Sequence, residues 1–512
     1  MHKLKIIRVT VACFVLVAIT LYFIDFTGLL PESFKFLTRI QWVPALLMVT
    51  PLLTVLILLS LFAGRFFCSA ICPLGILQDV MIRFTARFQK GKKHKYAYQK
   101  SYGWIRYGVL LLTFISFVTG SSAVLLWLDP YSNFGRIITN LIRPGVIAIN
   151  NLAATVFSSL KLYSVPVYRQ EIAALSYVSL AAVLVILIVL FLFTWRHGRM
   201  YCNVVCPVGT FLGMLSKVSL FRIRINQITC TSCGLCESYC KGGCIDTENK
   251  TVDVSRCVSC FNCLRVCKKG GVGYKYVAPS SDKLPKPAYF SRSRREALTV
   301  TSALLGSAVA SGMGRVTPAK IEADKAASRK AIMPPGANDR LSFNRKCTAC
   351  HLCITKCPNH ILTPATTHYG VSGILEPTVS YKKGYCNYNC TICSDVCPTG
   401  ALQKADIKEK RLIRIGVAQL RLDLCIVPTK KNDCGACAEH CPTQAVKMVP
   451  YENGLTIPTL DQRLCIGCGG CEFICPIRPY QAIYVEGLEL QSRAASPEEN
   501  QSDNNKVQDF GF

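Results

Sequence analysis

The sequence CTSCGLCESYC at residues 230–240 is followed by CVSCFNCLRVC at residues 257–267, which has the same cysteine spacing. In each segment two residues separate the first three cysteines from one another, and three residues precede the fourth. The chain of 512 residues contains 30 cysteines, and nearly all of them fall in tight groups. Such clustering argues against a plain soluble enzyme and an ordinary apolar transporter, and it indicates metal or redox chemistry.

This spacing is the one that bacterial ferredoxins use to bind 4Fe-4S clusters. Three cysteines wrap one corner of a cubane, and the fourth reaches the neighbouring cluster. The expected ligand sets are Cys230, Cys233, Cys236 with Cys267, and Cys257, Cys260, Cys263 with Cys240. A proline usually follows the fourth ligand, but Lys241 and Lys268 occupy these positions here. The spacing therefore does not settle the identity of the fourth ligand, and Cys244 is a candidate substitute.

The last third of the chain contains four such runs, and each ends in Cys-Pro; the first gap is widened to three residues in the second run and to eight in the third. The runs are Cys347, Cys350, Cys353, Cys357; Cys386, Cys390, Cys393, Cys397; Cys425, Cys434, Cys437, Cys441; and Cys465, Cys468, Cys471, Cys475. We expect the outer two runs to pair with each other and the inner two to pair likewise, with sequential pairing as the alternative. Zinc ribbons do not need cysteine triplets, which argues against zinc. Cys347, Cys350 and His351 match a haem-attachment pattern, but Cys353 continues the ferredoxin run through it, which argues against haem.

The composition predicts a membrane domain, because 51% of the residues are hydrophobic, 17% are charged and the mean hydropathy is +0.31. The four expected membrane spans are residues 9–24, 42–63, 107–128 and 172–195. The first follows a short basic segment and is interpreted as a retained anchor rather than a cleaved signal peptide. A moderately apolar stretch at 137–160 is expected to lie along the outer interface or on the surface of the bundle.

Loop charges predict the orientation. Residues 83–106 carry eight lysines or arginines and no acid, whereas residues 129–171 carry four basic and two acidic residues. The positive-inside rule therefore places the first loop, the N-terminus and everything after Trp195 in the cytoplasm, and the second loop outside. The net charge of +29 needs no nucleic-acid partner, since six clusters of roughly −2 each would offset about 12 of these charges.

An internal repeat follows the second and fourth expected spans. Residues 64–75 read GRFFCSAICPLG and residues 198–209 read GRMYCNVVCPVG, identical at six of twelve positions. Two such halves of a bundle could bring four sulfurs together in an arrangement that suits zinc, a single iron or an iron-sulfur cluster. The candidate metal ligands are Cys68, Cys72, Cys202 and Cys206. The alternative is four buried, inert thiols.

The linker between the two ferredoxin regions contains a second targeting feature. Arg294 and Arg295 precede eighteen uncharged residues at 297–314, as in a twin-arginine export signal. The alternative is a flexible linker rich in alanine and glycine. The expected fold is a membrane α-helical bundle of four spans, with a fifth considered, plus α+β ferredoxin-like modules. The expected parts are a bundle at 1–220, a cytoplasmic two-cluster module at 221–275, a linker at 276–340, a four-cluster module at 341–487 and a disordered tail at 488–512.

These motifs resemble the ferredoxin-type accessory proteins of periplasmic nitrate reductase systems, with a NapH-type membrane ferredoxin followed by an exported ferredoxin of the NapG/MauM type. The resemblance covers nearly the whole chain. It implies quinol oxidation and electron delivery across a bacterial inner membrane to a periplasmic reductase or cytochrome, with the last ferredoxin region in the periplasm. It supplies neither a catalytic residue nor a quinone site, and similar proteins serve different terminal acceptors.

We therefore expect an electron relay from quinol, or from a cytoplasmic donor, to a periplasmic reductase. One alternative is a maturation or reactivation factor that supplies electrons during assembly of a partner enzyme. Another is a cytoplasmic polyferredoxin that is only anchored at the membrane. Quinol-dependent reduction of the purified protein would favour the relay over the maturation factor.

The six cysteine runs make a quantitative prediction. Protein prepared without oxygen should contain about 24 iron atoms per chain in the six runs, with a matching amount of acid-labile sulfide. Iron and sulfide analysis of the purified protein measures both quantities. Stoichiometric zinc with little sulfide would contradict this assignment.

Overall fold

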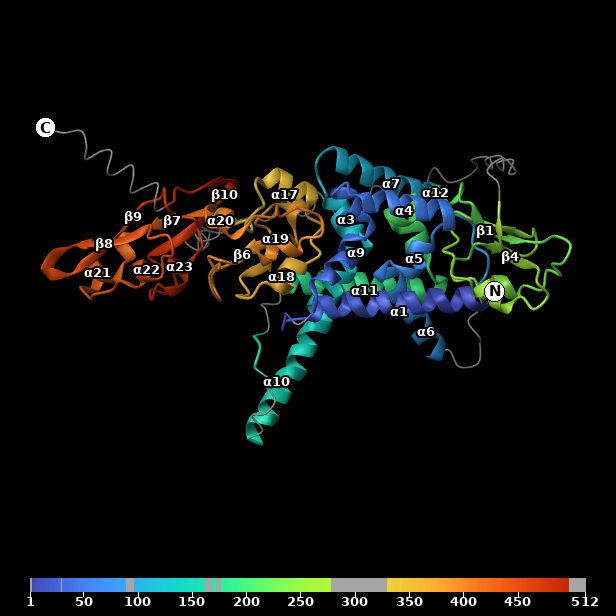
Figure 1. The fold of residues 1–512 in the computed structure, drawn as a ribbon, viewed down its shortest axis with the longest axis horizontal. Helices are drawn as coiled ribbons and strands as arrows, with labels where there is room; N and C mark the ends of the chain where they lie inside the picture. The colour runs from blue at the N-terminus through green and yellow to red at the C-terminus, as the bar shows by residue number, and fades with distance from the viewer. Residues whose placement is uncertain are drawn as a thin grey trace, which may run out of the picture. The chain divides into compact units, whose positions relative to one another are not determined.

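The computed structural model describes residues 2–28, 30–88, 96–161, 168–171, 176–277 and 329–496 (Figure 1). The expected twin-arginine signal and fifth span at 293–314 lie outside these residues.

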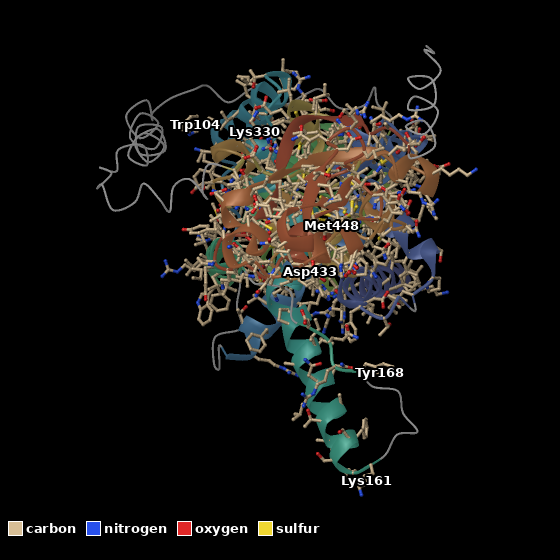
Figure 2. All side chains as sticks on the ribbon, turned by 90° about the vertical axis from the view of Figure 1, so that its left-hand side faces the viewer. Trp104, Lys161, Tyr168, Lys330, Asp433 and Met448 are labelled. Atoms are coloured by element: carbon tan, nitrogen blue, oxygen red, sulfur yellow. The ribbon has the colours of Figure 1, made fainter. Side chains whose placement is uncertain are left out.

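Within the residues that the structure describes, three helical stretches are long and apolar enough to cross a membrane. They are α1 (His2–Ile24), α11 (Tyr177–His197), and Pro130–Ser159, which comprises α9 (Pro130–Ile137), the π-helical turn η2 (Ile138–Ile142) and α10 (Arg143–Ser159). The last of these includes the stretch expected on the outer interface. Its α10 part projects away from the other helices, and Figure 2 shows Lys161 beyond its end.

The other two expected spans are interrupted. Residues 42–63 form α3 (Trp42–Leu47) and α4 (Pro51–Ala63), and residues 107–128 fall in α7 (Gly103–Val118) and α8 (Ala123–Leu128). The first break places Val49 at a φ of 48° just before the proline that begins α4, and the second places Gly120 at a φ of 84°. The structure therefore does not confirm the four expected spans. Hydropathy alone does not register a proline or a left-handed residue inside an apolar run.

Both halves of the repeat have the same local design. Gly64 ends α4 and Gly198 ends α11, with φ angles of +67° and +64° that favour glycine. The next turns are α5 (Phe66–Ala70) and the π-helical η3 (Tyr201–Val205). Pro73 and Pro207 then occupy the first positions of α6 (Pro73–Phe88) and α12 (Pro207–Ser216). Each Cys-Pro pair thus redirects the chain by starting a new helix.

The first ferredoxin module is a small α+β unit formed by residues 221–276. Its elements are β1 (Phe221–Ile225), α13 (Leu235–Ser238), β2 (Ile245–Asp246), β3 (Thr251–Val252), α14 (Asn262–Val266) and β4 (Val272–Tyr276). Strand β1 pairs antiparallel with β4, and β2 pairs with β3. The buried core includes Ile223, Phe261 and Val272 together with several cysteines.

The second ferredoxin module contains two cysteine-bearing halves. The first half holds α17 (Arg340–Lys346), α18 (Leu352–Lys356), β5 (Leu362–Pro364), β6 (Pro377–Val379), α19 (Ile392–Val396) and α20 (Ile407–Lys410). The second holds β7 (Ile413–Leu420), α21 (Ile426–Lys430), α22 (Ala436–Glu439), β8 (Val446–Pro450), β9 (Thr456–Leu460), α23 (Gly470–Ile474) and β10 (Ile483–Arg493). The antiparallel pairs are β5–β6, β8–β9 and β7–β10. Strand β10 continues six residues beyond the expected boundary at 487.

The carboxylate of Asp79 on α6 connects the first module to the bundle. It lies 3.0 Å from Nη1 of Arg8, 2.8 Å from Nη2 of Arg199 and 3.1 Å from Nζ of Lys241. Burial tends to raise the pKa of Asp79, but Arg199 and Lys241 hold that pKa well below its usual range. Lys241 directly follows Cys240. The lysine that replaces the usual proline therefore docks a cysteine-bearing loop on the bundle.

Replacing Asp79 with asparagine should destabilise the protein by about 3–5 kcal/mol, because it leaves buried cations without their counter-charge. The depressed pKa means that this contribution is complete near neutral pH and is lost as the pH falls below about 4, the unfolded value for aspartate. Thermal unfolding in detergent and protease cleavage of residues 221–276 would measure the effect. Asp246→Asn is the matched control, since that carboxylate bonds locally to Asn249. Equal stability of the two variants would refute the docking role.

Candidate iron-sulfur sites

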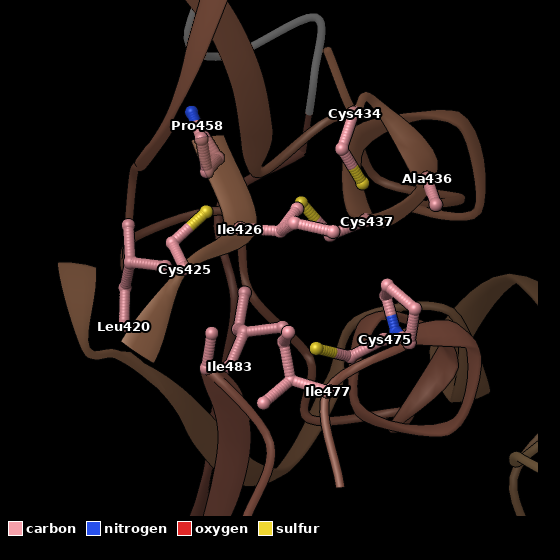
Figure 3. Close-up of a pocket in the computed structure, with 12 residues that line it drawn as sticks. Leu420, Cys425, Ile426, Cys434, Ala436, Cys437, Pro458, Cys475, Ile477 and Ile483 are labelled. Atoms are coloured by element: carbon pink, nitrogen blue, oxygen red, sulfur yellow. The ribbon is translucent and has the colours of Figure 1, made fainter. Parts of the chain in front are cut away.

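Four cysteines of the second module surround one apolar cavity (Figure 3). Cys425, Cys434 and Cys437 come from the third run of the C-terminal region, and Cys475 is the last cysteine of the fourth run. Their sulfurs point toward the space among them. The remaining walls are apolar and include Ile477. The first three cysteines of one run thus combine with the final cysteine of another.

The neighbouring cavity shows the reciprocal arrangement. Cys465, Cys468 and Cys471 from the fourth run line it together with Cys441, the last cysteine of the third run. The third and fourth runs therefore exchange their final cysteines. Helices α22 and α23 pack together between these sites, and the β8–β9 hairpin joins the two runs.

The first and second C-terminal runs pair in the same way. The electrostatic neighbours of Cys353 are Cys347, Cys350, Cys393 and Cys397, and those of Cys393 include Cys357, Cys386 and Cys390. Pairing is therefore sequential, and the nested pairing expected from the sequence is wrong. The physical reason is that adjacent runs are connected through short hairpins, and α18 packs directly on α19.

The haem-attachment pattern serves a different purpose in the structure. His351 is buried, and its Nε2 lies 3.0 Å from the carbonyl oxygen of Leu375. Burial and then the charge of Arg136 lower the pKa of His351 to about 3, so the ring is neutral at physiological pH. Its neighbours Cys347 and Cys350 instead gather with the other cysteines of the run.

The first module has the two expected groups of sulfurs and one additional thiol. Cys236 has Cys230, Cys233 and Cys267 as electrostatic neighbours. The second group lines an apolar cavity and consists of Cys240, Cys244, Cys257, Cys260 and Cys263. The sulfurs of Cys240 and Cys244 lie 3.4 Å apart. Hydrogen bonding from Cys244 lowers the pKa of Cys240 to about 7, which favours Cys240 as the ligand and Cys244 as a donor to its sulfur.

The chemistry of these cavities fits iron-sulfur clusters. Burial, reinforced by neighbouring cysteines, raises the pKa of Cys437 and of Cys468 to about 12. Four such thiols lose their protons together only when a cation compensates the charge, as a bound cluster does. Within the described parts of the chain, no group of three or more histidine, cysteine or carboxylate side chains is arranged to hold a single metal ion. The sulfurs instead surround apolar cavities in groups of four or five.

The structure brings the four cysteines of the internal repeat together inside the bundle. We call Cys68, Cys72, Cys202 and Cys206 the cysteine quartet; all four are buried, and the other three are electrostatic neighbours of Cys72. Two arginines cross between the repeats to hold them. Nη2 of Arg65 donates to the carbonyl oxygen of Cys202 at 2.9 Å, and Nη1 of Arg199 donates to the carbonyl oxygen of Cys68 at 2.9 Å.

Hydrogen bonds orient the thiols of the quartet. Cys206 caps α12, and its sulfur accepts from the backbone N–H of Gly209 at 3.3 Å. Cys202 donates to Oε1 of Gln78 at 3.2 Å. A side chain at Gly75 or Gly209 would clash with the carbonyl of the first cysteine in the same motif. The glycines of the repeat therefore allow close packing, whereas the role of Gln78 has no signal in the sequence.

One hydrophobic core contains the quartet and reaches both ferredoxin modules. Val258 of the first module belongs to this core and Cys260 packs against it, while Cys350 of the second module belongs to it and Cys353 packs against it. Gly135 on α9 lies so close to the carbonyl of Cys350 that a Cβ would clash. The quartet is therefore joined by continuous packing to a cysteine group of each module.

The two acids of the 129–171 loop differ in environment. The sequence predicts that Asp129 and Glu171 are solvated helix ends rather than acceptors of protons from quinol. Glu171 is exposed, but Asp129 is buried and caps α9 by accepting from the N–H of Ser132 at 2.8 Å. The expectation is therefore wrong for Asp129, because the second module and the bundle cover this end of α9.

Comparison with family models identifies the same segments. Residues 44–92 and 179–226 both match a model described as a 4Fe-4S binding domain, and each segment contains one Cys-x3-Cys-Pro motif. Residues 432–478 match a model described as a 4Fe-4S dicluster domain. That segment contains most of the third and fourth C-terminal runs, in agreement with their pairing in the structure.

Known ferredoxin-type relatives match about a third of the chain. The ferredoxin-type protein NapF of Escherichia coli K12 is 29% identical over 154 residues, 30% of this chain and 85% of NapF. The methylamine utilization ferredoxin-type protein MauM is 33% identical over 177 residues in Methylophilus methylotrophus, 31% of this chain and 71% of that MauM. In Methylorubrum extorquens MauM is 32% identical over 193 residues, 36% of this chain and 85% of that MauM. No solved structure matches the chain. With its paired cysteine runs and this identity over most of MauM, the chain belongs to the family of ferredoxin-type 4Fe-4S proteins that includes MauM.

Proposed function

We propose that this protein relays electrons across a bacterial inner membrane, from the first ferredoxin module on the cytoplasmic side to the second module on the periplasmic side. A periplasmic redox enzyme or cytochrome would then receive the electrons. In this proposal the chain combines a NapH-type membrane part with an exported NapG/MauM-type part. Its six cysteine runs hold six 4Fe-4S clusters through the residues of the expected sets, with the C-terminal runs paired sequentially.

The contacts at the two ends of α1 are the main support for this proposal. Near the start of this helix, Lys5 lies within electrostatic reach of Cys260 and Arg265 in the first module. Just beyond its end, Asp25 forms a 2.8 Å ion pair with Lys356 of the second module. The 23 residues of α1 extend about 34 Å at 1.5 Å per residue, and the hydrocarbon core of a bilayer is about 30 Å thick. The ends of one apolar helix of membrane-spanning length thus contact different ferredoxin modules.

The cysteine quartet is the proposed site of an intermediate redox centre between the two ferredoxin modules. Clusters at the two edges of a membrane are too far apart for direct contact, and the quartet lies in the core that joins them. Zinc has no redox chemistry in proteins, so a relay requires iron at this position. The two segments that match a 4Fe-4S binding domain have the quartet as their cysteines, which supports a cluster there.

Quinol or a cytoplasmic reductant is the proposed electron donor. When bound, the clusters supply one-electron redox chemistry, while the chain holds and orients them. Arg65 and Arg199 keep the two halves of the quartet in register through their bonds to backbone carbonyls. The apolar walls of the cavities exclude water from the sulfurs.

The topology of the second module gives a first test. A reporter that is active only in the periplasm should be active when fused beyond Ser496, since β10 runs to Arg493 and a junction inside it would disturb the sheet. Substituting Arg294→Lys with Arg295→Lys should abolish that activity if the twin-arginine signal exports the module. Activity unaffected by the double substitution would reject this route of export. An inactive parent fusion would support the cytoplasmic polyferredoxin instead.

Electron transfer through the quartet gives a second test. Purified protein is placed in lipid vesicles that enclose ferricyanide, and an impermeant reductant is added outside. We expect the enclosed ferricyanide to be reduced without added quinone, and we expect Cys202→Ser to slow this at least tenfold, because it removes one ligand of the intermediate redox centre. Absorbance of ferricyanide follows the reaction.

Cys13→Ser is the matched control, since Cys13 is exposed on α1 and outside the quartet. It should reduce ferricyanide at the parent rate, and both variants should retain the iron of the six runs. Equal rates for Cys202→Ser and the parent would reject the quartet as an intermediate redox centre. If electrons reach the ferricyanide only after quinone is added, then diffusing quinone carries them across the membrane instead of the quartet.

A further inference from the structure

Arg136 on α9 is a fully buried guanidinium at the contact between the bundle and the second module. Its Nη2 donates to Oδ1 of Asn133 at 2.6 Å and to the carbonyl oxygen of Leu126. Its guanidinium carbon lies 5.6 Å from the ring centre of Trp127. Within the described part of the chain, Nε and Nη1 have no hydrogen-bond partner. A buried cation with free donors is costly unless negative charge compensates it.

One carboxylate and two cysteines lie near Arg136. Asp129 begins the same helix, and Cys347 and Cys350 lie within electrostatic reach. The preceding residue, Gly135, lies against the carbonyl of Cys350. The guanidinium therefore lies beside the first cysteine group of the second module, where a bound cluster and its thiolates would add the missing negative charge.

We propose that Arg136 is a positioning residue that raises the reduction potential of the centre held by Cys347, Cys350, Cys353 and Cys397. One-electron reduction adds a negative charge to that centre, and a fixed positive charge nearby stabilises the reduced form. That this centre is the entry point for electrons leaving the bundle rests on the proposed relay. The effect on the potential does not depend on the relay.

The same helix connects Arg136 to the cysteine quartet. Nδ2 of Asn133 lies 3.4 Å from the hydroxyl oxygen of Tyr201, and Tyr201 is covalently bonded to Cys202. Two residues beyond Asn133, Gly135 touches the loop of Cys350. A short chain of contacts thus leads from the quartet to the centre beside Arg136. Placing the positive charge at the end of this chain makes electron arrival there favourable.

The test is a redox titration followed by electron paramagnetic resonance in detergent, where transport across a membrane plays no part. Arg136→Met removes the charge, keeps a similar volume and leaves no buried polar atom. We expect the potential of one centre to fall by at least about 59 mV, a tenfold drop in its reduced-to-oxidised ratio at fixed potential. Arg136→Lys should restore the parent value, and Arg136→Gln gives a second uncharged variant should the methionine variant not accumulate.

Arg143→Met is the matched control. Arg143 is also buried, on the adjoining α10, and its Nη2 donates to the carbonyl oxygen of Thr355 at 2.8 Å, while Asp25 is the charged group that faces it. Because Asp25 compensates the charge of Arg143, this variant should shift every potential by clearly less than Arg136→Met does. The shift caused by Arg136→Met should also vanish in a Cys350→Ser background, which removes the affected centre. Unchanged potentials in both uncharged variants, or a shift that persists in that background, would overturn the proposal.

Discussion

The reciprocal hydrogen bonds of Arg65 and Arg199 are the constraint on which the interior of this protein depends. Each arginine follows a helix-ending glycine, enters the core, and binds the backbone carbonyl of the first cysteine in the other repeat. A buried guanidinium is stable only where several acceptors surround it. The two repeats must therefore adopt one relative position, and this position brings their four cysteines together.

The same two arginines extend this constraint to the first ferredoxin module. Nη1 of Arg65 also donates to the carbonyl oxygen of Ser255 at 3.0 Å, two residues before Cys257. Arg199 bonds to Asp79, which also binds Lys241 beside Cys240. The groups that align the quartet thus also fix the loops that carry ferredoxin cysteines. A single network of buried charges therefore aligns the quartet with the cysteine-bearing loops of the first module.

Buried arginines recur wherever the bundle meets a cysteine-bearing loop. Those that are nearly inaccessible to solvent are Arg8, Arg65, Arg106, Arg136, Arg143 and Arg199. Several donate to backbone carbonyls of the ferredoxin modules, as Arg106 does to Ser255 and Arg143 does to Thr355. The excess of basic residues therefore has a structural use in addition to any attraction to anionic lipid. Clusters that carry negative charge would add to the compensation.

The sequence by itself determined the features that depend on local spacing. Three cysteines two residues apart can wrap a cluster corner in a short loop, and the two-half repeat was visible as GR, CxxxCP and G at matching positions. Hydropathy located the apolar segments but missed the breaks at Val49 and Gly120, because these depend on backbone conformation rather than on polarity.

Only the tertiary structure decided which runs share cavities, where the quartet lies, and that Asp79, Gln78 and Arg136 belong to these sites. Each of these features joins residues that are distant in sequence. Sequential and nested pairing use the same cysteines at the same spacing, so local sequence does not distinguish them. What distinguishes them is the packing of α18 on α19 and of α22 on α23. In the same way, a buried aspartate is recognised as a docking site only when its three cations, from separate segments, are seen to converge on it.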